Sequence, residues 1–250
     1  MEAIWSAAQA RLSHRMAMHF RVAPLALPGD QPVVSFTFDD VPQSAVARGA
    51  SILSDYGAHG TFYIAGGLVD RPSPDWKMID ADGVLALHRA GHEIGCHTYS
   101  HARACDLDAD AMACEVTCNR RYFQSLDPDI ELRNFAYPYG IGSFQRKRQL
   151  GEIFGSCRSV VPKVNSGIID LQFLSAIPLE SGRFDASDIE CILDETIAKG
   201  GWLIFYTHDV ASSPSRFGCT PGFLEKTIQK ARRRDTRILS IAEALQCFGA

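Results

Sequence analysis

The sequence predicts an α/β protein whose parallel strands form one sheet, open or closed into a barrel, with helices packed outside it. Short apolar runs alternate with longer amphipathic segments along all 250 residues, as in a chain of βαβ units. Hydrophobic residues make up 46% of the chain and charged residues 22%, the composition of a folded globular protein. Because no repeat and no Pro/Ser-rich linker interrupts this pattern, we expect one large core.

The strands are expected at the short apolar runs and the helices at the amphipathic stretches between them. Several of these stretches begin near an aspartate that can cap a helix or end near a glycine. The strands cover 33–38, 60–65, 92–96, 134–137, 157–161, 202–207 and 237–239, and the helices cover 44–56, 75–90, 107–126, 144–154, 188–199 and 222–234.

Residues 1–32 are expected to be an appendage to the sheet or barrel formed by 33–250. They read as a helix followed by an extended segment between Pro24 and Pro32. The helix is expected to pack outside the barrel or to close its bottom, and the alternative is contact with a membrane surface or a partner. Charged residues interrupt the segment 1–21, which argues against a cleaved signal peptide. No stretch has the roughly 18 apolar residues of a membrane span. We therefore expect a cytoplasmic location.

Net charge and cysteine count argue against two classes of protein. A formal net charge of −4 does not suit a general nucleic-acid binder. Eight cysteines would suit a secreted disulfide scaffold, but such scaffolds are short chains that lack a sufficient core. No CxxC pair occurs, although Cys114 and Cys118 would share a helix face. We therefore expect reduced cysteines that act as small hydrophobic residues.

Polar groups with catalytic potential directly follow four of the predicted strands. In a parallel sheet or barrel the carboxyl ends of the strands lie on one face, where active sites form. We therefore expect the four segments to meet at one site. They are Asp39-Asp40, His97, Pro138-Tyr139-Gly140 and His208.

Two histidines and an aspartate in these segments suit a divalent metal. His97 and His101 lie four residues apart, and imidazole suits Zn²⁺ and neighbouring ions. Thr98 stands where the HExxH motif of zinc proteases has its glutamate, so a base must come from elsewhere. Asp39 or Asp40 would supply the third ligand, and both can face one cavity only if the chain turns there. The alternatives are a helix cap for the aspartates and surface positions for the histidines.

His208 ends a strongly apolar strand. A histidine there is either a turn or core residue or, opposite a metal site, a general acid, because an ordinary imidazole titrates near pH ~6.5. The choice between these readings depends on whether the other segments converge on it.

Four ordered motifs then carry a family resemblance. They are Thr37-Phe38-Asp39-Asp40, His97-Thr98-x-x-His101, Tyr137-Pro138-Tyr139-Gly140 and Leu203-x-x-x-x-His208. Together they resemble the motifs of the polysaccharide deacetylase (NodB-homology) family of carbohydrate esterases, over most of the chain. The resemblance implies a distorted (β/α) barrel that removes N-acetyl groups from an amino sugar with a divalent metal, Zn²⁺ first and Co²⁺ or Ni²⁺ as alternatives.

The resemblance also implies roles for individual residues. By motif, Asp40, His97 and His101 resemble the metal ligands, Asp39 the catalytic base and His208 the catalytic acid. A backbone N–H near Tyr139 would hold the oxyanion, and Tyr137 and Pro138 belong to the same substrate-binding motif. The tyrosines that could stack on a sugar ring or pack in the core are Tyr99, Tyr137, Tyr139 and Tyr206.

The chain departs from the family pattern in two places. Ala136 stands where an arginine that orients the base is expected, and Arg133 comes three residues too early. Arg183 is the candidate to reach the base instead. The late Asp-Trp motif that tunes the acid is poorly matched by the segment from Asp185 to Ile189. These gaps leave the tuning of the base and the choice of substrate open.

Three functions are consistent with this sequence. The first is a metal-dependent deacetylase that acts on an acetylated polysaccharide, oligosaccharide, or nucleotide- or lipid-linked saccharide, and a lipid-linked substrate would bring the N-terminal helix to a membrane surface. The second is a hydrolase of a non-sugar C–N bond, in a cyclic imide or ureide. The third is a non-catalytic sugar-binding barrel. The sequence leaves the oligomeric state undecided.

Overall fold

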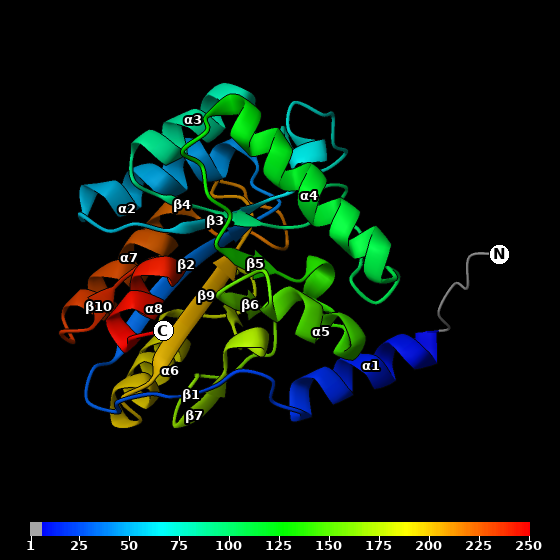
Figure 1. Ribbon diagram of the computed structural model, residues 1–250. Coiled ribbons are helices and arrows are strands. Elements are labelled where there is room, and N and C mark those ends of the chain that lie inside the picture. Colours follow the sequence, from blue (N-terminus) through cyan, green and yellow to red (C-terminus); the bar gives the residue numbers. More distant parts are fainter. Residues whose placement is uncertain (1–6) are drawn as a thin grey trace.

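Eight parallel strands form the central sheet of the computed structural model, which describes residues 7–250 (Figure 1). The strand order is β6-β5-β4-β3-β2-β9-β8, and β10 pairs with the start of β2. The expected α/β architecture with parallel pairing is confirmed. The strands of this sheet are β2 (Val33–Asp39), β3 (Thr61–Ile64), β4 (Glu93–Cys96), β5 (Asn134–Ala136), β6 (Ser156–Arg158), β8 (Ile177–Pro178), β9 (Trp202–Thr207) and β10 (Arg237–Ile238).

The sheet curls until its two edges are joined through the segment that precedes β8. The backbone N–H of Leu174 donates to the carbonyl of Cys157 at 2.8 Å, and the N–H of Ser159 donates to the carbonyl of Leu174 at 2.7 Å. Ile177 and Pro178 then pair with β9. This short seam makes the sheet a distorted barrel, so the carboxyl ends of its strands surround one opening.

Helices lie outside the curled sheet (Figure 1). Side-chain caps fix several of their starts, as at α4, where the carboxylate of Asp108 accepts from the N–H of Ala111 at 2.8 Å. A π-helical turn, η1 (Ala45–Ala50), leads into α2. The helices are α1 (Ala7–His19), α2 (Ser51–Asp55), α3 (Ala81–Arg89), α4 (Ala109–Leu126), α5 (Phe144–Gly151), α6 (Ala186–Ala198), α7 (Pro221–Arg232) and α8 (Ile241–Phe248).

The structure corrects the predicted helix over 75–90, which begins only at Ala81. The carboxylate of Asp80 accepts from the N–H of Gly83 at 2.8 Å and so sets the N-terminus of α3. The residues before it form an irregular segment that folds back on the end of β2, where the N–H of Ile79 donates to the carbonyl of Val41 at 3.1 Å. This brings the 70–80 segment to the opening of the barrel.

Three short strands and one helix lie outside the predicted elements. Strands β1 (Pro24–Ala26) and β7 (Ile168–Asp170) form a separate antiparallel pair, and β8 has only two residues. Strands this short carry no alternation that a sequence pattern could reveal. Helix α8 does have a sequence signal, the capping box of Ser240 and Glu243.

Helix α1 packs against α5 outside the barrel, the first of the two positions expected for it. The ammonium of Lys147 on α5 is fully buried, and it donates to the carbonyls of Ala17 at 2.5 Å and Phe20 at 2.8 Å. It also pairs with Asp170 at 2.5 Å. These contacts satisfy the carbonyls at the C-terminal end of α1 and fix the helix on the barrel.

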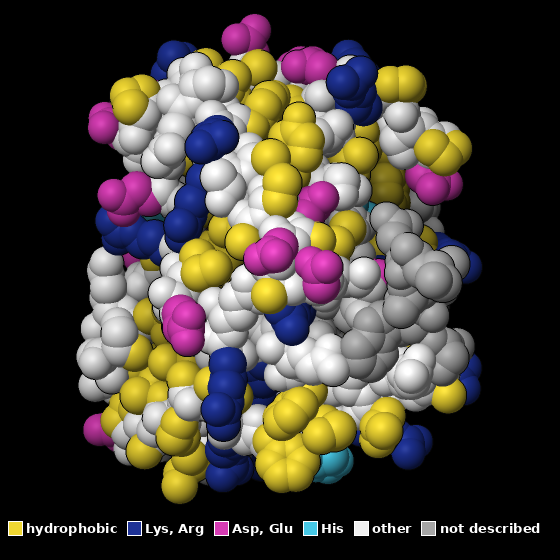
Figure 2. Space-filling model, turned by 45° about the vertical axis from the view of Figure 1, so that its right-hand side comes forward, with side chains coloured by type: hydrophobic (Ala, Val, Ile, Leu, Met, Phe, Trp, Pro, Cys, Tyr) yellow, Lys and Arg dark blue, Asp and Glu magenta, His cyan; other side chains and the backbone are white. Residues whose placement is uncertain are grey.

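The molecular surface mixes charges and carries some exposed apolar side chains. The face in Figure 2 has Lys and Arg interspersed with Asp and Glu, and apolar side chains gather toward its lower edge. On and just after α1, Leu12 is 60% and Phe20 57% exposed. Within residues 7–250, each helix is too short or too polar to span a membrane.

The cysteines are unpaired, and half of them belong to the interior. All eight lie within the described residues and none forms a disulfide there. Cys114 and Cys118 do share a helix face, with their sulfur atoms 3.9 Å apart. The buried ones are Cys96, Cys105, Cys157 and Cys219.

Candidate active site

Strand β2 ends in two aspartates whose carboxylates face one cavity because the chain turns between them. Asp39 is the buried last residue of the strand. Asp40 has a φ of 56°, in the left-handed region that non-glycine residues seldom occupy. The N–H of Val41 donates to the carbonyl of Asp39 at 2.6 Å and closes this turn. Such local strain is typical of functional sites.

The two histidines lie on a turn after β4 and not on a helix. Thr98 and His101 have φ values of 57° and 60°, which fold the segment so that both imidazoles point the same way. Glu115 of α4 holds this turn, because its Oε2 accepts from the N–H groups of Tyr99 and Ser100, both at 2.8 Å. No sequence pattern pointed to this supporting role of Glu115.

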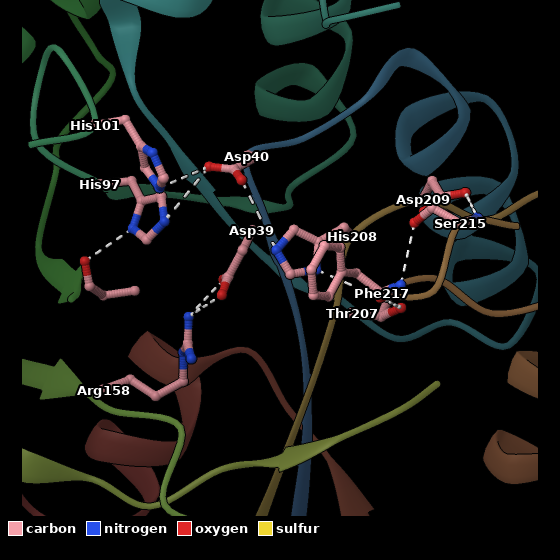
Figure 3. A network of polar contacts seen from close by, with 11 residues as sticks. Asp39, Asp40, His97, His101, Arg158, Thr207, His208, Asp209, Ser215 and Phe217 are labelled. Atoms are coloured by element: carbon pink, nitrogen blue, oxygen red, sulfur yellow. Dashed lines mark hydrogen bonds and ion pairs between the residues drawn. The ribbon is translucent and has the colours of Figure 1, made fainter. Parts of the chain in front are cut away.

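Asp40 faces both histidines with one carboxylate oxygen (Figure 3). Its Oδ1 is 3.1 Å from Nε2 of His101 and 3.6 Å from Nε2 of His97. The three ligand atoms lie within 4.8 Å of one another, and the buried Oδ1 has no hydrogen-bond partner. An orphaned carboxylate oxygen beside two imidazole nitrogens is a donor set that fits Zn²⁺ or a similar ion.

Both imidazoles are held in the neutral form that binds metals. Burial, with His101 adding to it, lowers the pKa of His97 to about 3, and burial lowers the pKa of His101 as well. Nδ1 of His97 lies 2.8 Å from the carbonyl of Ala136, so this nitrogen carries the proton and Nε2 is left with its lone pair. Burial, strengthened by the charge of Asp39, raises the pKa of Asp40 to about 6.

The base candidate Asp39 is paired with an arginine that sequence reasoning missed. Nη2 of Arg158 lies 2.5 Å from Oδ1 and 2.6 Å from Oδ2 of Asp39. Arg158 ends β6, is fully buried and lies between the rings of Tyr63 and Tyr206, at 5.1 and 5.4 Å. Burial is the largest single influence and would raise the pKa of Asp39, but the charges of Arg158, His97 and His208 and the hydrogen bond from Arg158 together outweigh it and lower that pKa.

Arg183, the arginine that the sequence suggested for this task, lies elsewhere in the wall. It is half exposed and its nearest ion pair is with Glu180, at 3.9 Å. A signal for Arg158 was present, since a charged residue inside an apolar strand must have a buried partner. The sequence did not say which acid that partner would be.

His208 faces the same cavity from the end of β9. Its Nε2 is 3.8 Å from Oδ2 of Asp40, and its Nδ1 is 3.4 Å from the carbonyl of Phe217. The ring of Trp76 stacks on it, with centroids 5.5 Å apart and an interplanar angle of 16°. Asp185, from the poorly matched late motif, caps α6 instead. The tryptophan beside His208 thus comes from the 70–80 segment.

Of the three residues in the Pro-aromatic-Gly motif, Tyr139 and Gly140 line the cavity and Pro138 does not. Tyr139 has a φ of 58°, and its ring centroid is 4.5 Å from that of His101. Pro138 is buried, and the hydroxyl of the buried Tyr137 donates to the carbonyl of Gln172 at 3.2 Å. The substrate contact expected of Tyr137 is therefore not a side-chain contact in this structure.

The two aspartates, the three histidines, Trp76 and Tyr139 line one cavity of about 1120 Å³. Its floor holds the aspartates and histidines, and aromatic rings form much of its wall, a combination suited to a sugar ring with a polar substituent. Tyr206 contributes to this wall, whereas Tyr99 is not among the residues that line the cavity. The aromatic residues of the wall are Trp76, Tyr139, Tyr206 and Phe217.

Comparisons with known proteins point to one family. The family model for polysaccharide deacetylases matches residues 26–151. A chitin deacetylase of Arthroderma benhamiae is 31% identical over 87 residues, which are 33% of this chain and 21% of that protein. The chain thus matches only about a fifth of the length of this curated relative.

Solved structures share the fold at low sequence identity. A protein of Mycobacterium smegmatis assigned to the polysaccharide deacetylases aligns with a TM-score of 0.68 and 17% identity, over 92% of this chain and 94% of that one. A family 4 acetyl xylan esterase of Clostridium thermocellum, solved with a cobalt ion, aligns with a TM-score of 0.61 and 18% identity, over 87% and 92%. At this identity the likeness concerns the fold.

Proposed function

The chain belongs to the polysaccharide deacetylase family, and we propose that it is a metal-dependent hydrolase that removes the N-acetyl group from an amino sugar of a saccharide. The observation that supports this most is the convergence of two carboxylates and three imidazoles on one cavity. Their chemistry divides into a metal-binding set and a proton-transferring pair. The metal-binding set is Asp40, His97 and His101, and the proton-transferring pair is Asp39 and His208.

The metal-binding set would hold a divalent ion, Zn²⁺ first and Co²⁺ or Ni²⁺ as alternatives. Such an ion, when bound, polarises an amide carbonyl and makes water more acidic. The protein prepares for it by keeping His97 and His101 neutral and by leaving Oδ1 of Asp40 without a donor. The carbonyl of Ala136 fixes the ring of His97 in the orientation that ligation needs.

Asp39 would take the proton of the attacking water. Its lowered pKa keeps it a carboxylate at neutral pH, and the two contacts from Arg158 fix its orientation toward the cavity. A charge this deeply buried needs such a partner to stay ionised. Arg158 is a positioning residue in this scheme, because it acts through Asp39.

His208 would deliver a proton to the departing nitrogen. Its Nε2 faces Asp40 across the cavity, while Nδ1 lies near the carbonyl of Phe217. The stacked ring of Trp76 covers one side of the imidazole and limits its rotation. The backbone N–H of Tyr139 would donate to the developing oxyanion, a type of contact that carries a large share of such catalysis.

Acetate release from N-acetylglucosamine oligosaccharides, with zinc or cobalt present, tests this function. The Asp39→Asn variant should lose activity while it keeps bound metal, and His101→Ala should lose the metal itself. Asp55→Asn, at the exposed end of α2, is the matched control. Absence of acetate release together with hydrolysis of a cyclic imide or ureide would favour the second function. Binding of the oligosaccharide without hydrolysis would favour the non-catalytic barrel.

The cellular location stays a prediction. Fractionation of cells that express the tagged chain would test the expected cytoplasmic position, and a purely periplasmic signal would contradict it.

A further inference from the structure

A smaller cavity of about 310 Å³ lies beside the candidate active site and is lined by basic side chains. We propose that this cavity, the arginine basin, binds a phosphate group carried by the saccharide substrate. The inference rests on the proposed function and adds the substrate class, an N-acetylated sugar with a phosphate or diphosphate ester. The basin is lined by Ala10, Arg11, His14, Arg15, Arg103 and Ile141.

Within residues 7–250, no carboxylate pairs with the arginines of the basin. Three of its six lining residues are arginines and none is an acid. Among the ion pairs found in this part of the chain, none involves Arg11, Arg15 or Arg103. An anion bound among like charges that line one cavity relieves their repulsion, and the guanidinium fork matches phosphate oxygens in pairs. The net charge of the chain is −4, so this concentration of positive charge is local.

His14 adds a neutral hydrogen-bond donor to the basin. The N–H of Gly142 donates to its Nδ1 at 3.1 Å, so the proton of the neutral ring must be on Nε2. Burial lowers the pKa of His14 and favours this neutral form. An N–H donor among three guanidinium groups suits an anion and would not suit a metal cation.

The arginines of α1 have a fixed position relative to the barrel. Buried Lys147 binds the carbonyls of Ala17 and Phe20 at the end of this helix. The helix therefore cannot slide without breaking these buried contacts, which are costly to lose. Arg11 and Arg15 lie about one helical turn apart and so present their side chains on the same face.

A single tyrosine separates the basin from the candidate metal site. The guanidinium of Arg103 lies over the ring of Tyr139, 4.8 Å from its centroid, and the imidazole of His101 lies against the same ring, at 4.5 Å between centroids. A substrate whose acetamido group reaches the metal site would therefore place a group on a neighbouring ring carbon near Tyr139. A phosphate there would meet the arginines, whereas a neutral sugar unit would give them no counter-charge.

The larger cavity carries charges of both signs. Arg71, Arg183 and Arg216 line it together with Asp75 and Glu180, and Asp39 and Asp40 lie on its floor. Among the residues that line the two cavities, the basin alone has basic groups without an acid. A phosphate group is therefore expected in the basin, where the charge favours an anion.

The test compares phosphorylated substrates with a neutral one. Acetate release from N-acetylglucosamine with a phosphate or a uridine diphosphate at its anomeric carbon is measured against release from a neutral N-acetylglucosamine oligosaccharide. In the double variant Arg11→Gln/Arg15→Gln, the ratio of kcat/KM for phosphorylated over neutral substrate should fall at least about tenfold, as expected for lost charge-assisted contacts. The control Arg89→Gln/Arg233→Gln removes the same charge from exposed sites and should keep the wild-type ratio. Equal ratios in both variants would overturn the proposal.

Binding separates this inference from the proposed function. If no substrate releases acetate, the deacetylase assignment fails, and calorimetry on the metal-free chain with the sugar phosphate still tests the basin. The wild type should bind it at least about tenfold more tightly than Arg11→Gln/Arg15→Gln, and equal affinities would refute the basin.

A lipid headgroup is the other source of phosphate, because Leu12 is exposed on the same helix and Phe20 is exposed just after it. Sedimentation with vesicles of phosphatidylglycerol and phosphatidylcholine distinguishes the two sources. If the double variant loses vesicle binding but keeps its affinity for the sugar phosphate, the arginines serve the lipid surface and the substrate assignment is wrong.

Discussion

The guanidinium of Arg158 lies directly against the carboxylate of Asp39, with Nη2 2.5 and 2.6 Å from its two oxygens. The two residues are 119 positions apart in the chain, and both are buried. The pair holds the carboxylate of Asp39 in a fixed orientation and favours its charged form. In the proposed mechanism it would do what an arginine at the position of Ala136 was expected to do.

We expect Arg158→Met to abolish this arrangement. Removing one partner of a buried ion pair typically costs about 3 to 5 kcal/mol in unfolding free energy. Activity should fall at least about a hundredfold, the usual contribution of a positioned base. Denaturant unfolding and acetate release measure the two effects.

Arg183→Met is the comparison for that variant. Arg183 is half exposed and pairs only loosely with Glu180, so its loss should change stability by less than about 1 kcal/mol. Its effect on activity should be much smaller than that of Arg158→Met. Equal losses in the two variants would mean that Asp39 does not depend on Arg158.

The contrast between these arginines shows what the sequence could and could not predict. Side chains that directly follow an apolar strand could be placed on one rim, because the strand ends of a parallel sheet meet. Arg158 and Trp76 could not, because their roles depend on which strands and loops become neighbours. Trp76 also fell within a predicted helix whose true start is Ala81. The residues whose convergence was predictable are Asp39, Asp40, His97, His101 and His208, and their chemical roles stay predictions.

Local geometry explains the rest of the differences. Strands of two or three residues, such as β8 and β1, show no periodicity and are held by hydrogen bonds to distant partners. The buried hydroxyl of Tyr137 was equally invisible, since a tyrosine in such a motif can face the cavity or the core.

Glu115 should control metal affinity without touching the metal. It holds the turn between His97 and His101 through the N–H groups of Tyr99 and Ser100. Glu115→Ala releases that turn, and loss of such outer contacts typically weakens metal binding about 10- to 100-fold. Zinc titration with a competing chelator measures the affinity.

Glu115→Gln keeps one acceptor oxygen for the turn and should restore part of that affinity. Asp110→Ala, on an exposed position of the same helix, serves as the control and should bind zinc like the wild type. If Glu115→Ala binds zinc normally, the turn holds its shape without α4.

Trp76 should matter for turnover through its stacking on His208. Trp76→Ala should lower kcat roughly three- to tenfold, because an aromatic pair contributes about 0.5 to 1.5 kcal/mol beyond its buried area. Trp76→Phe preserves a flat ring and should recover most of the loss. A steady-state comparison of kcat and KM in the two variants would show this, and a change in KM alone would assign Trp76 to substrate binding.

His92 should make the unfolding free energy depend on pH between about 4 and 6.5. It is buried, its Nδ1 accepts from the N–H of Gly60 at 3.1 Å, and its Nε2 lies 3.2 Å from the hydroxyl of Ser54. Burial, with His59 nearby, lowers its pKa from 6.5 to about 4. Between these two values the unfolded chain binds more protons than the folded chain, so stability falls as the pH falls.

The contribution of His92 is therefore complete above pH 6.5 and is lost progressively on acidification to about pH 4. A shift of this size corresponds to about 3 kcal/mol. Other groups titrate in the same range, so the test is the difference between the wild type and His92→Gln, which cannot titrate. Denaturant unfolding at several pH values should show a steeper decline for the wild type, and parallel curves would mean that His92 titrates alike in the folded and unfolded chain.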